Sequence, residues 1–177
     1  MRLALFDYGA GNMHSLAKAL EVAGARVEPT GDWDIALARD ALVLPGVGAF
    51  GSAAAALPED RVRVRTALAE GLPCLGICLG MQLLFADSEE SEGSGIGLVP
   101  GRVRRLEADV VPHMGWNDVE AAADPLFEGV PALVAYFANS YVCEPADEAA
   151  LRLALETLVQ ACTAATFASA ERCCCSY

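Results

Sequence analysis

Lysine, histidine and long apolar runs are scarce in this chain of 177 residues. Its one lysine is Lys18, its two histidines are His14 and His113, and its net charge is −12. A chain this acidic, with no long basic tract, is not expected to bind nucleic acid through the phosphates. No apolar run approaches the roughly 20 residues that span a bilayer, so no membrane association is expected either. Small molecules or a protein surface are the expected targets.

A secretory signal is not expected either, because the apolar stretch that follows Met1 and Arg2 is too short for one. We therefore expect a cytoplasmic protein, whose thiols are free rather than paired in disulfides. The adjacent C-terminal cysteines point apart and no histidine lies near them, so no metal site is expected there. No cofactor is expected either. The seven cysteines are Cys74, Cys78, Cys143, Cys162 and the three at 173–175.

The first 86 residues alternate between strand-like and helix-like segments. This alternation predicts an α/β fold with an open, mostly parallel sheet flanked by helices. Strands are expected at 2–9, 25–29, 40–46 and 73–78, and helices at 12–24, 61–70 and 79–86.

The remainder of the chain is predicted to be rich in β-strands. Four strand-like segments separated by turns lie at 96–107, 110–120, 132–143 and 151–158, and residues 87–95, "DSEESEGSG", are expected to form a polar surface loop. The length and the 54% content of hydrophobic residues favour one domain with a sizeable core.

Residues 76–80, "GICLG", place Cys78 between two glycines where a strand is expected to turn into a helix. Gly76 and Gly80 would permit the strained backbone of a nucleophile elbow. The N-terminus of the following helix would lower the pKa of the thiol, and the Leu79 N–H could face a developing oxyanion. A buried structural cysteine is the alternative, and the glycine pair favours the nucleophile.

Two more glycine-rich turns follow predicted strands. In "DYGAGN", at 7–12, His14 stands where a dinucleotide-binding fingerprint would have its third glycine, so a tight turn is the better interpretation. "PGVG", at 45–48, is a flexible backbone stretch able to donate N–H groups, although an ordinary loop remains the alternative. In an open α/β sheet, ligands bind at the carboxyl ends of the strands, where all three turns are predicted.

The order of these motifs resembles a known family. "DYGAGN", "LPGVGAFG", "GICLGMQLLF", "SEE", "GLVPG", "VPHMGWN" and "YFANSY" closely resemble the glutaminase subunits of imidazole glycerol phosphate synthase, which are class I glutamine amidotransferases of histidine biosynthesis. The resemblance runs from about residue 3 to residue 145 and implies a flavodoxin-like fold. It also implies that glutamine is hydrolysed to glutamate and ammonia. A cyclase subunit, a (β/α)8 barrel bound as a heterodimer partner, would consume the ammonia to form imidazole glycerol phosphate and AICAR.

The resemblance implies a role for each matching residue. Cys78 would be the nucleophile, and Val47 and Leu79 would donate oxyanion N–H groups. The residues implied to hold glutamine are Gly48, Gln82, Glu90, Ser140 and Tyr141. Those implied to lie at the ammonia exit and the partner interface are His113, Met114, Trp116, Asn117 and Tyr136. Asn139 replaces a histidine that often precedes the Ser/Thr-Tyr pair, and we expect this change to be tolerated.

The chain departs from the family in one important respect. The family completes its triad with a histidine and a glutamate in a C-terminal "HPEKS"-like segment, whereas no histidine follows His113 here and residues 171–177 read "ERCCCSY". Residues 1–177 are thus expected to form one amidotransferase domain that is incomplete or altered after about residue 170. An altered reading frame and a member without the triad are the two explanations.

Three functions remain open from the sequence. The first is a glutaminase subunit whose thiol lacks its base, which would lose most of its acyl-transfer rate. The second is a non-catalytic partner that docks on the cyclase barrel. The third is a class I amidotransferase serving another synthase, against which "PHMGWN" argues.

Overall fold

The computed structural model describes residues 1–9, 12–46, 48–118, 134–147 and 150. The expected strand at 151–158, the expected change after residue 170 and the candidate oxyanion residue Val47 lie outside these ranges.

A four-stranded sheet forms the first half of the molecule. Its strands are β1 (Arg2–Phe6), β2 (Arg26–Thr30), β3 (Ala41–Leu44) and β4 (Cys74–Gly76). The order is β2-β1-β3-β4, and every neighbouring pair is parallel. The predicted parallel sheet is therefore confirmed, with all four of its strands.

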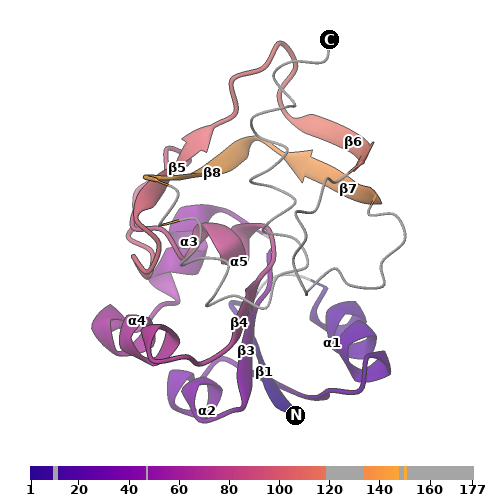
Figure 1. Cartoon of the computed structure of the whole chain (residues 1–177), viewed down its shortest axis with the longest axis vertical. Helices are drawn as coiled ribbons and strands as arrows, with labels where there is room; N and C mark the ends of the chain where they lie inside the picture. Colours follow the sequence, from indigo (N-terminus) through magenta and orange to yellow (C-terminus); the bar gives the residue numbers. More distant parts are fainter. Residues whose placement is uncertain (10–11, 47, 119–133, 148–149, 151–177) are drawn as a thin grey trace.

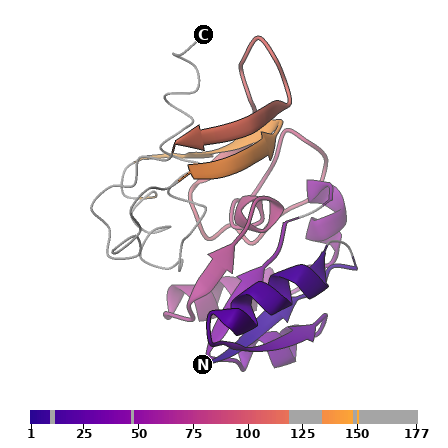
Figure 2. The ribbon, with the colours of Figure 1, turned by 90° about the vertical axis from the view of Figure 1, so that its right-hand side faces the viewer.

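Helices cover both faces of the sheet, with α1 (Met13–Val22) on one face and α2 (Trp33–Leu37) and α4 (Arg61–Ala69) on the other (Figure 1). Seen from the side, α1 lies across the front of the strands (Figure 2). Two further short helices, α3 (Phe50–Ala55) and α5 (Leu79–Gln82), are the next elements after β3 and β4. They therefore begin at the carboxyl ends of these neighbouring strands.

The helix α1 matches its predicted pattern. Asn12 caps it by accepting a hydrogen bond from Ser15 N–H, and Gly24 follows its end with φ +93. The four residues at helical spacing pack on the sheet beside Leu3, Leu5 and Val43, and they are Met13, Leu16, Ala17 and Leu20. His14 is exposed, as predicted.

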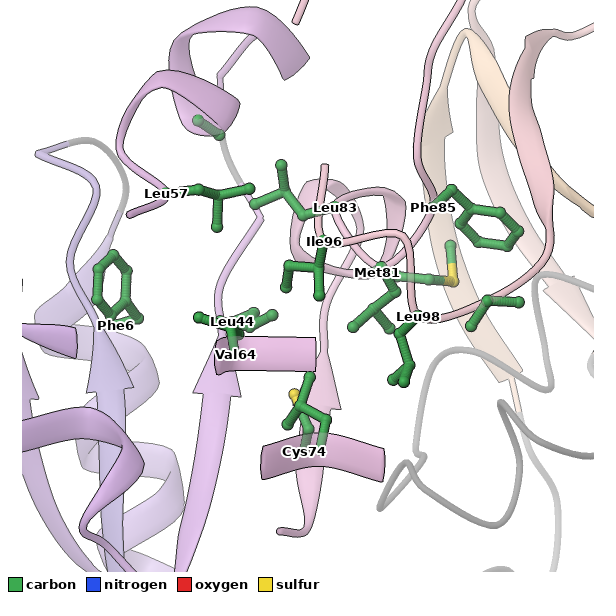
Figure 3. Packing of buried hydrophobic residues seen from close by; sticks show 14 of the residues in the cluster. Phe6, Leu44, Leu57, Val64, Cys74, Met81, Leu83, Phe85, Ile96 and Leu98 are labelled. Carbon is green, nitrogen blue, oxygen red and sulfur yellow. The ribbon is translucent and has the colours of Figure 1, made fainter. Parts of the chain in front are cut away.

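The larger part of the core lies on the opposite face of the sheet. Figure 3 shows Phe6, Leu44 and Cys74 from the strands near Val64 of α4 and Leu57. The same cluster continues through Met81, Leu83, Phe85, Ile96 and Leu98, so the segment after α5 is part of the core (Figure 3). This apolar support holds the carboxyl ends of β3 and β4 in place.

The structure differs from the predicted helices at two points. The helices α2 and α3 were not predicted, although Asp32 gives a local signal by capping α2 at Asp34 N–H and Ile35 N–H. The helix expected at 79–86 ends at Gln82. It ends there because the next carbonyls bond elsewhere: Leu83 O accepts from Ile96 N–H at 2.7 Å, and Leu84 O accepts from Leu98 N–H at 2.8 Å.

Two antiparallel pairs make up the second half. They join β5 (Gly101–Arg105) to β8 (Tyr141–Pro145) and β6 (His113–Asp118) to β7 (Val134–Asn139). They lie beyond the end of the parallel sheet that carries α3 and α5 (Figure 1). The predicted strands at 96–107, 110–120 and 132–143 are confirmed, the last of them as parts of two strands.

Candidate functional site

Cys78 occupies a sharp turn between β4 and α5. It precedes α5 with φ +52 and ψ −108, and it is the one non-glycine residue of positive φ in the described ranges. Such a conformation is costly for a residue with a side chain and is typical of functional turns. The strand-to-helix turn predicted from "GICLG" is thus present, and Cys78 is exposed on it.

The glycines on both sides of Cys78 are required by close backbone packing. A Cβ on Gly80 would lie 1.9 Å from the carbonyl oxygen of Leu44 on β3. A Cβ on Gly76 would lie 2.8 Å from the backbone nitrogen of Met81, which is the first turn of α5 folding back on its own strand. Both distances are too short for any carbon atom, so only glycine lets the chain turn this tightly.

The loop after β3 packs directly on this turn. A Cβ on Gly46 would lie 1.9 Å from Ile77 O and 2.7 Å from both Cys78 Cβ and Leu79 N. The loop continues through Gly48, which is exposed and has φ +115. The structure therefore brings "PGVG" and "GICLG" together at the carboxyl ends of β3 and β4. No local sequence signal distinguishes Gly46, because its need for glycine arises only from this contact.

The electrostatic environment of the thiol corrects one expectation. The sequence predicted a lowered pKa, but the pKa of the Cys78 thiol is raised. Although Cys78 reaches the surface, protein atoms packed around the turn partly desolvate its sulfur, and this is the largest cause. A hydrogen bond from Leu79 N–H does lower the pKa, as expected of a helix N-terminus, whereas the negative charge of Glu90 raises it. With only four residues, α5 has too small a dipole to outweigh burial.

Residues 88–92 are more than the polar surface loop that their composition predicted. Glu90 and Ser91 are only partly exposed, and both accept hydrogen bonds from the first turn of α3. Phe50 N–H donates to Glu90 Oε2 at 2.7 Å, and Gly51 N–H donates to Ser91 Oγ at 2.8 Å. The loop thereby brings a carboxylate close enough to act on the Cys78 thiol. Ser91 was missed by sequence analysis.

Gln82 and Tyr141 border the same region. Gln82 lies one turn after Cys78, is 8% exposed, and has a buried Oε1 with no hydrogen-bond partner in the described part of the chain. Tyr141 packs against the apolar cluster that contains Leu79. On the same strand, Cys143 is buried, and the pKa of its thiol is raised first by burial and then by the charge of Cys78. Ser140 joins β7 to β8, and its carbonyl accepts from Leu106 N–H.

The remaining candidate residues lie together on the β6–β7 ribbon. Met114, Trp116 and Tyr136 are 63%, 71% and 53% exposed, and the rings of Trp116 and Tyr136 meet edge to face with centroids 5.5 Å apart. His113 bonds to Asn117 through Nε2 and Nδ2, 2.8 Å apart. The alternation of the strands puts these two residues on the face of the ribbon opposite to Trp116.

Neither histidine hydrogen-bonds Cys78 in the described residues. His14 is exposed on α1, and His113 contacts Asn117 and the ring of Phe137. The described part of the chain therefore supplies a strained thiol, backbone N–H groups and a carboxylate, but no imidazole beside the sulfur. No helix within it is long and apolar enough to cross a membrane.

Comparison with known proteins agrees with this arrangement. The family model "Glutamine amidotransferase class-I" matches residues 4–174. A solved structure titled "Crystal structure of glutamine amidotransferase" has the same fold, with a TM-score of 0.65 and 19% identity over 82% of this chain and 75% of that one.

Curated relatives are more similar in sequence. Imidazole glycerol phosphate synthase subunit HisH of Natronomonas pharaonis is 46% identical over 157 residues, which cover 84% of this chain and 73% of the relative. Imidazole glycerol phosphate synthase subunit HisH of Nocardia farcinica is 50% identical over 148 residues, which cover 80% of this chain and 70% of the relative. The chain therefore belongs to the class I glutamine amidotransferases, in the group of the glutaminase subunits of imidazole glycerol phosphate synthase.

Proposed function

We propose that Cys78 is the nucleophile with which this glutaminase subunit attacks the side-chain amide of glutamine. The observation that carries the proposal is the backbone of Cys78, which holds φ +52 on an exposed turn at the carboxyl end of β4. Such strain persists where the surrounding structure enforces it, and here Gly46, Gly76 and Gly80 do so. A cysteine with a purely structural role needs no such support.

The proposed reaction needs a nucleophile, hydrogen-bond donors for the oxyanion, and residues that bind glutamine. The thiolate adds to the amide carbon, and the resulting oxyanion would accept hydrogen bonds from the backbone N–H groups of Leu79 and of the loop at 47–48. Ammonia leaves with a transferred proton, and water then hydrolyses the thioester to glutamate. Gly48, Gln82, Glu90, Ser140 and Tyr141 would hold the glutamine.

The exposed aromatic surface suggests where the ammonia is used. Met114, Trp116 and Tyr136 leave apolar area open on the ribbon, which is the kind of surface that anchors a protein partner. The proposed partner is the cyclase barrel, which would receive the ammonia and form imidazole glycerol phosphate and AICAR. His113 and Asn117, on the opposite face of the same strands, would border the ammonia exit.

A second candidate is a partner of the cyclase that makes little or no ammonia. The observation that favours it is the position of the two histidines, His14 on α1 and His113 on β6, neither of which bonds to Cys78 in the described residues. Among the described residues, no histidine hydrogen-bonds the Cys78 thiol, whose pKa is raised, so none of them is placed to take its proton.

Covalent labelling tests the nucleophile without requiring turnover. A chloromethyl ketone analogue of glutamine should label Cys78 first among the seven cysteines, and free glutamine should slow that labelling. Cys74 and Cys143 are buried and serve as internal references. Preferential labelling of Cys143, or labelling that glutamine does not slow, would count against the proposal.

A further inference from the structure

The first turn of α3 is capped from a distant part of the chain. Ala49, the residue before α3, makes no side-chain hydrogen bond to the helix. Instead, Phe50 N–H and Gly51 N–H donate to Glu90 Oε2 and Ser91 Oγ. The first N–H groups of a helix lack partners within the helix, so these two side chains act as its cap.

The backbone around Ser91 closes tightly on the same turn. A Cβ on Gly51 would lie 2.6 Å from Glu92 O and 3.0 Å from Ser91 Oγ. Gly93 has φ +134, and a Cβ on it would lie 3.4 Å from the Cα of Gly51. Glycine on both sides therefore allows the two backbones to approach. The bond from Gly51 to Ser91 belongs to a packed contact between two segments.

This contact fixes one end of the loop that joins β3 to α3. The other end is fixed at Gly46, which lies against Ile77 and Cys78. Between these ends lies Gly48, which has φ +115 and no side chain with which to hold its position. The position of the loop beside Cys78 therefore depends on how firmly its two ends are held.

We infer that Ser91 is a positioning residue for the loop at 45–49, through its hydrogen bond to Gly51 N–H. The inference rests on the proposed function, to which it adds a residue that does not contact glutamine. By holding the first turn of α3, Ser91 keeps Gly48 beside Leu79, where a Cβ on Gly48 would lie 3.9 Å from Leu79 Cδ2, so that the Gly48 N–H can serve the oxyanion that forms on Cys78. Glu90 caps the neighbouring N–H group, but its charge also acts on the Cys78 thiol. Ser91 is uncharged and so isolates the positioning effect.

The experiment compares the full chain with Ser91→Ala, Ser91→Thr and Ser94→Ala. Ser94 is exposed in the same loop and is the matched control. One readout is amide hydrogen exchange at Gly51. The others are the rates at which Cys78 reacts with two reagents. The thiolate adds to the carbonyl carbon of the chloromethyl ketone analogue and forms an oxyanion before its sulfur displaces chloride, whereas it displaces iodide from iodoacetamide directly.

Ser91→Ala should exchange faster at Gly51 and react with the ketone about five- to tenfold more slowly, as expected for the loss of one hydrogen bond. Its rate with iodoacetamide should not change. Ser91→Thr keeps the hydroxyl and should restore both readouts, and Ser94→Ala should match the unmodified chain. Thermal melts confirm that each variant is folded.

Unchanged exchange at Gly51 in Ser91→Ala would overturn the inference, and so would faster exchange with an unchanged ketone rate. An equal fall in the ketone and iodoacetamide rates would also overturn it, because Ser91 would then act on the thiol itself. If the ketone fails to label Cys78 in the unmodified chain, the proposed function fails first, and the inference fails with it.

Discussion

Gly46 lies directly against Cys78, so that a Cβ on Gly46 would come within 2.7 Å of the Cys78 Cβ and 1.9 Å of Ile77 O. This contact joins two glycine-rich segments that are separated by about thirty residues in the sequence. It places the backbone of the β3–α3 loop next to the proposed nucleophile. The contact leaves no room for a side chain, which makes it open to a simple mutational test.

Gly46→Ala should therefore destabilise the protein and remove the labelling of Cys78 by the ketone analogue. The added methyl group meets backbone atoms that cannot rotate away, and we expect a loss of about 3 kcal/mol or more in the free energy of unfolding. Chemical denaturation measures it. Gly115→Ala is the control, because a Cβ there has no atom within 4 Å. An unfolding free energy for Gly46→Ala equal to that of the control would contradict the tight packing.

Glu90→Gln should lower the pKa of the Cys78 thiol. The amide oxygen can still accept from Phe50 N–H, so the change removes the charge and keeps the cap. Since the charge of Glu90 raises the thiol pKa, its removal should shift the rise of alkylation rate to lower pH. Iodoacetamide rates at Cys78, measured across pH by peptide mapping, test this. Glu89→Gln, which removes an exposed charge nearby, should leave the pH dependence of alkylation unchanged. An equal shift in both variants would contradict a specific effect of Glu90, because it would show that any loss of negative charge lowers the thiol pKa.

Trp116→Ala should weaken binding to the cyclase, and the isolated variant should be almost as stable as the unmodified chain. Trp116 is 71% exposed and packs against Tyr136, so its truncation should cost the monomer about 1 kcal/mol or less. A buried aromatic anchor in a complex is typically worth about 2 kcal/mol or more. Titration calorimetry with the cyclase measures the difference. Val22→Ala, at an 81% exposed position on α1, is the control. If Trp116→Ala and Val22→Ala bind the cyclase with equal affinity, Trp116 does not lie in the interface.

The chain should lose stability in alkaline solution through its buried thiols. Burial raises the pKa of Cys74 to about 12 from an ordinary value of 9.0. The folded state thus keeps a proton that the unfolded state releases. The stabilisation is present below pH 9 and is lost as the pH rises toward 12, by about 1.4 kcal/mol per pH unit for this group. Urea unfolding at a series of pH values gives the free energy of unfolding as a function of pH. Between pH 9 and 12 this free energy should fall less steeply for Cys74→Ala than for the unmodified chain, by that amount per pH unit. Parallel curves for the two proteins above pH 9 would contradict it.

Glutamine turnover by the 177-residue chain should be close to background, even with the cyclase bound. A base that takes the thiol proton and returns it to ammonia is worth about 10²–10⁴-fold in rate, and none bonds to Cys78 in the described residues. Adding a C-terminal His-Pro-Glu segment should restore activity that depends on Cys78. Coupled detection of glutamate measures both. Robust turnover by the unmodified chain, abolished by His113→Ala, would instead make His113 the base.

Much of the fold could be predicted from local sequence signals. The apolar spacing of Leu16 and Leu20 predicted the face of α1 that packs on the sheet. The short apolar run at 73–78 predicted β4. Local signals failed where the next hydrogen-bond partner is distant in sequence. The helix after Cys78 ends at Gln82 because Leu83 and Leu84 bond to the segment at 96–98, which no periodicity reveals.

The same division applies to the site. The sequence by itself indicated the turn at Cys78, because glycines two residues away on each side permit the tight backbone, and it showed that no histidine follows His113 within the 177 residues. Only the tertiary structure decided the protonation tendency of the thiol, the packing of Gly46 and the cap made by Ser91. These depend on desolvation and on contacts across 30 to 40 residues, and such effects arise only when the chain is folded.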